Sequence, residues 1–507
     1  MTKKILINDD PWQIRVAIII NNDLQNIYFG SKTKEHLERS FFKGKITKIM
    51  PGIQTAFVDI GQEKSGFLHN SEIDRELALR KLEEGALFEP LKPTDKTEKN
   101  EYMGKCDISK VFKEGDEILV QVSKEPMNEK GAKLSTCFAI PGRFIVLMPN
   151  IAKIGVSKKI KSKEERLRLK DIVREFLPEG MGAIIRTTSE EHESKEIIQD
   201  LNYLIETWYE VNKTFKQAKP AEKIYQDIDL SLQIVRDYLD NDVEFILVDN
   251  KDTQLQVYKF VKQVAPEHAH KVKLYQGPPS LFDKFNIEKQ IEQALDKKVN
   301  LKSGGSIIIE TTEAMTVIDV NTGRYAGKTS LEETILKTNL EAADAVTRQL
   351  RLRNIGGLIV IDFIDMANAS NRQKLFKFFE KTLKEQDKFQ SVLLKISEFG
   401  LVQMTRKRSG KTLTQELTNK CPTCKGLGFI KSNQNESFEV LRKVRDQLES
   451  KKASGQILLT VNPEVFHYLI NKEYNSILYL EKTYRAKITI TSQDDLPDAS
   501  CKIQQLN

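Results

Sequence analysis

The sequence has few cysteines and no long hydrophobic run. Five cysteines among 507 residues are too few for a disulfide framework. The apolar run near the N-terminus, residues 16–20, is far shorter than a membrane span, and no small-residue cleavage site follows it. No later stretch approaches a transmembrane helix. These absences argue against a disulfide-stapled secreted protein and a membrane protein, so we expect a cytoplasmic location.

A strong excess of charge of either sign is also missing. Lys and Arg number 79 against 72 Asp and Glu, a net charge of +7 that is mild for this length. Such a total does not identify a nucleic-acid binder, because local basic patches matter more than sums. A chain of 507 residues exceeds what one hydrophobic core supports, so we expect several domains.

The first half of the chain is rich in short strands. Residues 1–37 contain strands that must pair with partners later in the chain, and the strand patterns within 216–278 could supply them. Residues 38–128 predict a small β-barrel, because Pro51, Gly61 and Gly66 break it into short alternating strands. A charged insertion near 77–105 interrupts the barrel, and residues 129–215 add strands and a charged helix at 163–176.

Residues 279–400 have the clearest pattern. They predict a β-hairpin around 311–314, then a helix that opens at Ser330 with a capping box and ends near Arg353. A buried strand at 358–363, a helix at about 371–385 and a strand at 391–396 follow, an order that implies a parallel pair joined by a right-handed crossover. Residues 431–507 predict a small α/β domain with a helix at 438–450, followed by two strands with one helix between them.

Two carboxylates end strands in this region. Asp319 ends one strand and Asp362 ends the next, so parallel neighbours would bring both to one sheet edge, where ligands bind. Converging carboxylates suit Mg²⁺, and Asn321 lies on the same strand face as Asp319. Either aspartate alone could simply cap a turn, but an ionised carboxylate within an apolar strand is costly without a cation or donor. Glu313 and Asp365 are weaker candidates.

Cys421 and Cys424 form a CxxC pair followed by glycines, typical of a zinc knuckle. Structural zinc takes four ligands, and the chain has no second CxxC or suitable CxxH. The pair could therefore be redox-active or incidental, or two chains could each give two thiolates to one Zn²⁺.

Several long motifs together resemble one known family. The segments KSGGSIIIETTEAMTVIDVNTGRYAGK, TNLEAADAVTRQLRLRNIGGLIVIDFIDM, MTRKRSGKTL and CPTCKGLG, in this order, are similar to the catalytic core of the RNase E/G family, and MTRKRSGKTL is closer to its RNase G branch. The resemblance implies an α/β multidomain protein with the following parts: an RNase H-like fold (1–37 and 216–278), an inserted OB-fold RNA-binding barrel (38–128), a 5′-sensor region (129–215), a DNase I-like catalytic subdomain (279–400), a zinc-link (401–430) and a small C-terminal α/β domain (431–507).

The resemblance also implies a chemistry and an assembly. Asp319 and Asp362 match the family's Mg²⁺ ligands, and Asn321 matches its supporting residue. The expected reaction is hydrolysis of A/U-rich single-stranded RNA, in rRNA and tRNA processing and mRNA decay, leaving a 5′-monophosphate and a 3′-hydroxyl. Cys421 and Cys424 match a zinc site shared between chains, which predicts a homodimer or homotetramer.

The resemblance further assigns RNA contacts. Phe57 and Phe67 could be core residues of a small barrel, but they match aromatics that stack on bases and stand near Lys43, Lys45, Lys48 and Lys64. Lys130 matches a basic RNA contact. Arg186 and Thr187, with Gly142 and Val146 as pocket wall, match a pocket for a 5′-monophosphate, whose oxygens suit a guanidinium fork. The acidic segment 189–196 departs from the family pattern.

Two other functions remain open from the residues alone. One is a non-catalytic scaffold for single-stranded RNA, and the other is a metal-dependent phosphoesterase for small molecules. The paired carboxylates argue against the first and the RNA-binding barrel against the second. The chain ends about 80 residues after the cysteine pair, so we expect no long scaffold tail for a degradosome.

Overall fold

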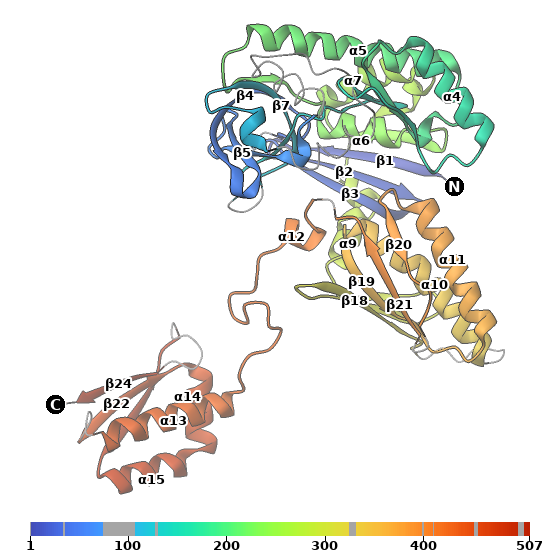
Figure 1. The fold of residues 1–507 in the computed structure, drawn as a ribbon. Helices are drawn as coiled ribbons and strands as arrows, with labels where there is room; N and C mark the ends of the chain where they lie inside the picture. Colours follow the sequence, from blue (N-terminus) through green and yellow to red (C-terminus); the bar gives the residue numbers. More distant parts are fainter. Residues whose placement is uncertain are drawn as a thin grey trace. The chain divides into compact units, whose positions relative to one another are not determined.

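The computed structural model describes residues 2–33, 36–74, 107–126, 130–323, 331–397, 400–408, 410–450, 455–494 and 501–506. The chain divides into two compact units, Met1–Leu413 and Thr414–Asn507, coloured along the sequence in Figure 1. The charged insertion near 77–105 and Ser330 of the expected capping box lie outside the described residues.

The first sheet joins the N-terminal strands to strands from the middle of the chain. Its order is β15-β14-β1-β2-β3, and its strands are β1 (Lys3–Asp9), β2 (Gln13–Ile20), β3 (Asp23–Ser31), β14 (Val243–Val248) and β15 (Val272–Leu274). β1 runs antiparallel to β2 and parallel to β14. This pairing confirms that residues 1–37 find their partners within 216–278.

Both faces of this sheet are buried, as its continuous runs of Ile and Val require. One face packs on α6 (Leu230–Tyr238) and α7 (Lys251–Val264). The other packs on α8 (Leu281–Lys284) and α9 (Ile287–Gln293). The 3₁₀ helix η5 (Pro266–Lys271) leads from α7 into β15.

The second sheet closes into the predicted barrel. Its order is β13-β4-β5-β6-β8-β7, and β4 also pairs with β7 to close the ring. Its elements are β4 (Phe41–Met50), η1 (Pro51–Ile53), β5 (Thr55–Asp59), β6 (Gly66–His69), η2 (Asn70–Glu72), α3 (Ile108–Val111), β7 (Glu117–Lys124), β8 (Lys133–Ser135) and β13 (Lys223–Tyr225). β8 lies beyond residue 128, so the barrel extends past the predicted end of its segment.

The third sheet follows the barrel in the chain, with the order β11-β12-β10-β9. Its elements are β9 (Ile140–Pro141), β10 (Ile145–Met148), β11 (Ile154–Val156), α4 (Lys163–Phe176), β12 (Gly182–Ile185), η4 (Thr187–Ser189) and α5 (Ser194–Gln217). The charged helix predicted at 163–176 is α4, and Ser162 caps its N-terminus by accepting a hydrogen bond from the Glu165 N–H. α4 and α5 pack against this sheet.

The fourth sheet contains the two candidate aspartates. Its order is β16-β17-β18-β19-β21-β20, with β16 (Lys298–Asn300), β17 (Ser306–Thr311), β18 (Met315–Asn321), α10 (Leu331–Leu352), β19 (Gly357–Asp362), α11 (Ala369–Gln386), β20 (Ser391–Leu393) and β21 (Leu401–Arg406). The β17–β18 hairpin and the end of α10 confirm the sequence predictions.

One predicted pairing in this sheet is wrong. β20 runs in the same direction as β19 but does not pair with it, because β21 lies between them and is antiparallel to both. The chain turns back after β20 and inserts β21 into the position that a simple crossover would have given to β20. The parallel neighbours joined by one helix are instead β18 and β19, connected through α10.

The second unit is a three-stranded sheet with helices. It contains α13 (Asn433–Glu449), β22 (Gln456–Val461), α14 (Pro463–Lys472), α15 (Tyr474–Tyr484), β23 (Lys487–Ser492) and β24 (Lys502–Leu506), with strand order β23-β22-β24. Two helices replace the single one predicted, because the backbone at Glu473 leaves helical geometry between them. β24 was not predicted. α12 (Leu413–Leu417) spans the boundary of the two units. Across the described residues, no helix combines the length and apolarity needed to cross a membrane.

Candidate functional site

Asp319 and Asp362 are direct neighbours across two parallel strands. β18 and β19 pair from Met315 with Leu358 through to Asp319 with Asp362, so the two aspartates occupy one register position at the carboxyl ends of the strands. Side chains at paired positions project from the same face of a sheet. The structure therefore brings together the two residues that the strand endings predicted.

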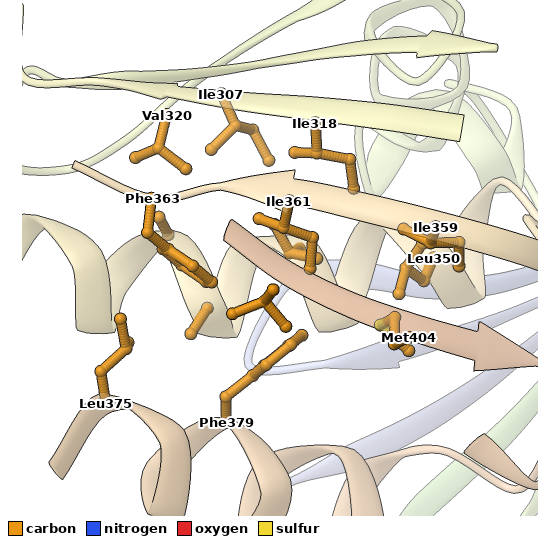
Figure 2. Packing of buried hydrophobic residues seen from close by; sticks show 14 of the residues in the cluster. Ile307, Ile318, Val320, Leu350, Ile359, Ile361, Phe363, Leu375, Phe379 and Met404 are labelled. Atoms are coloured by element: carbon orange, nitrogen blue, oxygen red, sulfur yellow. The ribbon is translucent and has the colours of Figure 1, made fainter. Parts of the chain in front are cut away.

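Both aspartates lie on the face of the sheet that the helices leave uncovered. The opposite face carries Ile318, Ile359 and Ile361, which are buried against α10 and α11 (Figure 2). Alternation along each strand then turns Asp319 and Asp362 outward, where Asp319 is half-buried and Asp362 is exposed. The expectation of a carboxylate buried within an apolar strand was wrong for Asp362, because β19 is buried on one face only.

The electrostatics of the pair fit a cation. Partial burial and the negative charges of Asp319 and Asp365 raise the pKa of Asp362 above its ordinary value. Asn321 donates an amide hydrogen to Oδ2 of Asp319 at 2.8 Å, which fixes that carboxylate. Two adjacent carboxylates that repel one another suit Mg²⁺, which uses one or two carboxylates and fills its other positions with water and substrate oxygens. Within the described residues, no cluster of three or more His, Cys, Asp or Glu side chains forms a fuller metal site.

Phe57 and Phe67 lie outside the barrel core. They pair directly across β5 and β6, whereas Ala56, Val58 and Leu68 fill the interior. Neighbouring pairs place Lys48 beside Phe57 and Lys133 beside Phe67. The result is an aromatic row, Lys48–Phe57–Phe67–Lys133, that crosses four strands on the outer face of the barrel.

The lysines of this segment differ in their surroundings. Lys43 does not serve the aromatic row: its Nζ donates to the Ala218 carbonyl at 3.0 Å, pairs with Glu117 at 3.1 Å and lies over the Phe215 ring. Lys45, Lys48, Lys64 and Lys130 are exposed. Lys133, which the sequence interpretation missed, is half-buried and ion-paired with Glu72.

Two residues of the expected phosphate pocket, Arg186 and Gly142, are in direct contact. Arg186 follows β12, and its Nη1 donates to the Gly142 carbonyl at 2.6 Å and to Oδ1 of Asp237 at 2.8 Å. Thr187 begins η4 with an exposed side chain. Val146 is half-buried in β10, opposite Ile184 of β12. The expected residues thus lie on or next to the β10–β12 pair, and the structure adds Asp237, 51 residues along the chain, as a partner of Arg186.

Gly142 is required by close packing at this pocket. A Cβ at this position would lie 2.5 Å from a carboxylate oxygen of Asp200. That carboxylate accepts backbone N–H bonds from Arg143 at 3.1 Å, Phe144 at 2.9 Å and Ile145 at 3.1 Å, so it cannot move aside without losing them. Burial raises the pKa of Asp200 despite these bonds. A larger residue at 142 would therefore distort the loop that holds Arg186.

The acidic segment 189–196 is engaged in helix capping and lines an open depression. Glu193 and Glu196 form a capping box at the start of α5, and His192 pairs with Glu196 at 3.1 Å. Acidic side chains of this segment and Glu267 line a depression of about 450 Å³ that begins three residues after Thr187.

Cys421 and Cys424 belong to the second unit and form a knuckle. Backbone N–H groups of Gly428 and Gly426 hydrogen-bond the sulfur of Cys424, and together with the Cys421 thiol they lower the pKa of Cys424. Both glycines have positive φ, +96° and +81° for Gly426 and Gly428, a conformation that side chains disfavour and that turns the amides toward the sulfur. This geometry favours a thiolate, the form that binds zinc.

Comparison with known proteins covers almost the whole chain. The profile of the Ribonuclease E/G family matches residues 139–409, the S1 RNA binding domain matches 38–136, and the RNase E/G thioredoxin-like domain matches 420–506. Ribonuclease G of Escherichia coli K12 is 36% identical over 481 residues, 95% of either chain. Ribonuclease G of Haemophilus influenzae is 38% identical over 475 residues, covering 94% of this chain and 93% of the relative. Ribonuclease E of Haemophilus influenzae is 35% identical over 496 residues, 97% of this chain but 51% of the relative.

Proposed function

This chain belongs to the ribonuclease E/G family and is an endoribonuclease most like ribonuclease G, and we propose that it hydrolyses single-stranded, A/U-rich RNA with Mg²⁺ held at Asp319 and Asp362. The observation that carries the proposal is the register of β18 and β19, which sets the two carboxylates side by side on the sheet face opposite α10 and α11. Family membership disfavours the non-catalytic scaffold and the small-molecule phosphoesterase.

Each residue of the pair has a defined part in this proposal. Asp319 and Asp362 would ligate the metal, and the Asn321 amide, by donating to Oδ2 of Asp319, leaves Oδ1 free to do so. When bound, Mg²⁺ supplies positive charge to the scissile phosphate and makes a bound water more acidic. Because Asp362 is exposed, an RNA strand would be able to reach it. Hydrolysis of this kind would leave a 5′-monophosphate and a 3′-hydroxyl.

The decisive experiment is a cleavage assay on a short, 5′-monophosphorylated A/U-rich RNA. We expect cleavage with Mg²⁺ and none after chelation, with activity restored when excess Mg²⁺ is added back. A G/C-rich duplex of equal length serves as the control and is expected to stay intact. Undiminished cleavage in chelator would contradict metal-dependent chemistry at this pair.

The aromatic row is proposed to hold the RNA strand. Unpaired bases would stack on Phe57 and Phe67, while the exposed ammonium of Lys48 faces the backbone phosphates. A duplex hides its base faces, so this surface would select single strands. Lys130, exposed after the barrel's last long strand, would add a further basic contact.

Phe57→Ala or Phe67→Ala is therefore expected to weaken binding of single-stranded RNA, each by roughly 1–3 kcal/mol, the range for one base–aromatic stack. Fluorescence anisotropy with a labelled RNA measures the change. Tyr209→Ala, which removes a ring that is 55% exposed on α5, is the matched control and should leave affinity unchanged. If the two Phe variants bound as tightly as the control, the aromatic row would not be the RNA surface.

We further propose that Arg186 and Thr187 sense a 5′-monophosphate, so that 5′-monophosphorylated RNA is cleaved faster than hydroxylated or triphosphorylated RNA. The guanidinium and the exposed hydroxyl are donors suited to an anion. Roles in rRNA and tRNA processing and in mRNA decay, a cytoplasmic location, and a homodimer or homotetramer joined by shared zinc complete the proposal.

A further inference from the structure

The guanidinium of Arg186 is held by one of its three nitrogens. Nη1 donates to both the Gly142 carbonyl and Oδ1 of Asp237, and the side chain is 24% exposed. Among the described residues, Nε and Nη2 have no hydrogen-bond partner. These two nitrogens form the edge of a guanidinium that donates two parallel bonds to phosphate oxygens.

Asp237 is itself held from several sides. Its carboxylate accepts a bond from Nε of Arg236 at 3.3 Å, and its backbone carbonyl accepts one from Nζ of Lys388 at 2.8 Å. Lys388 belongs to the segment between α11 and β20, and its Nζ also lies over the ring of Tyr238. Burial would raise the pKa of Asp237, but its interactions with Arg186 and Arg236 outweigh burial and keep it charged. The Asp237 carboxylate is therefore a fixed, ionised partner.

A run of backbone N–H groups in this region could also bind an anion, but the Asp200 carboxylate already occupies it. The consecutive N–H groups of Arg143, Phe144 and Ile145 could cradle a phosphate, but they bind the Asp200 carboxylate. Among the described residues expected at the pocket, the donors that remain for a phosphate are the Nε–Nη2 edge of Arg186 and the Thr187 hydroxyl.

We propose that Asp237 is the positioning residue of the phosphate sensor: by holding Nη1 together with the Gly142 carbonyl, it presents the Nε–Nη2 edge of Arg186 to the 5′-monophosphate of RNA. The inference rests on the proposed sensing function. Asp237 should therefore affect cleavage only of RNA that carries a 5′-monophosphate, because an RNA with a 5′-hydroxyl end places no anion on the Nε–Nη2 edge.

The test compares kcat/KM on one A/U-rich RNA with either a 5′-monophosphate or a 5′-hydroxyl. Asp237→Ala is expected to lower the monophosphate-to-hydroxyl ratio by about tenfold, the effect of one charge-assisted hydrogen bond. The loss should lie in KM for the monophosphorylated RNA, and cleavage of the hydroxylated RNA should stay within about twofold of wild type, which also reports correct folding. Asp237→Asn keeps an acceptor oxygen and should give an intermediate ratio.

Two variants make the outcomes separable. Arg186→Ala should reduce the monophosphate-to-hydroxyl ratio to one if the sensor exists. Asp171→Ala, which breaks an exposed ion pair with Arg174 on α4, should leave the ratio unchanged. If Arg186→Ala reduces the monophosphate-to-hydroxyl ratio to one but Asp237→Ala preserves or raises it, the positioning role alone is overturned. A raised ratio would show that Asp237 competes with the phosphate for Arg186. Equal wild-type rates on both RNAs overturn the sensing proposal and the inference with it.

Discussion

Replacing Asp362 with asparagine is expected to lower RNA cleavage by more than about 100-fold while leaving the fold and RNA affinity nearly unchanged. Loss of residues that merely support a metal ligand costs about 10- to 100-fold, and loss of a ligand itself should cost more. Asp319→Asn should have the same effect. The fold should persist because Asp362 is exposed and the buried face of β19 is untouched.

The matched control for these variants is Glu310→Gln. Glu310 lies on β17 in the same sheet, is exposed, and forms an ion pair with Lys297 at 3.0 Å, so the substitution removes one nearby carboxylate charge without changing Asp319 or Asp362. Cleavage should stay within about twofold of wild type, as for most surface substitutions. Initial rates on a labelled RNA, together with binding measured by anisotropy, separate loss of chemistry from loss of affinity. Full activity in Asp319→Asn or Asp362→Asn would refute the catalytic assignment.

The same pair predicts a pH dependence. The pKa of Asp362 is raised by partial burial and by Asp319, so protons compete for this carboxylate at a higher pH than for an isolated aspartate. Metal binding needs the deprotonated form, and cleavage should therefore fall as pH decreases through the raised pKa. Higher Mg²⁺ concentration should move the fall to lower pH, because the cation displaces the proton.

The sequence was informative where chemistry follows strand periodicity. An aspartate at the end of each of two apolar strands, with one helix between them, was enough to predict that Asp319 and Asp362 meet. The face on which they meet could not be predicted, because a run such as LIVIDF contains apolar residues at both parities. Leu358 is 41% exposed in the structure, whereas Ile359 is fully buried, and only the packing of α10 and α11 distinguishes them.

Contacts between segments far apart in the chain could not be predicted from the sequence. Asp237 stands 51 residues after Arg186, on a helix whose pattern reports only its buried face. Lys133 completes the aromatic row from a strand of three residues, too short to give a periodic signal. Lys43, by contrast, resembled its exposed neighbours in sequence, but the return of α5 to the barrel supplies it with structural partners.

Among the substitutions considered, those of Cys421 and Cys424 are expected to have the largest effect on assembly of the chain into oligomers. In the proposed zinc site each knuckle would supply two cysteine sulfurs, and the described residues of the chain bring no third metal ligand to them. A tetrahedral zinc site would then need two chains, with half a zinc atom per chain. Structural zinc contributes about 10–16 kcal/mol in small zinc-binding peptides, enough for the dimer to depend on it.

Cys421→Ser is therefore expected to abolish zinc binding and convert dimers into monomers, seen by elemental analysis and sedimentation velocity. Cys501→Ser is the matched control: its half-buried thiol belongs to the same unit but lies against the core of the small domain, so zinc and dimers should be retained. A redox-active pair would behave differently: reduction would convert one intrachain disulfide into two thiols, adding two hydrogens, and would leave the oligomeric state unchanged. A stable dimer without zinc, or one zinc bound per chain, would contradict the shared site, because two thiolates from a single knuckle leave half of the tetrahedron to other ligands.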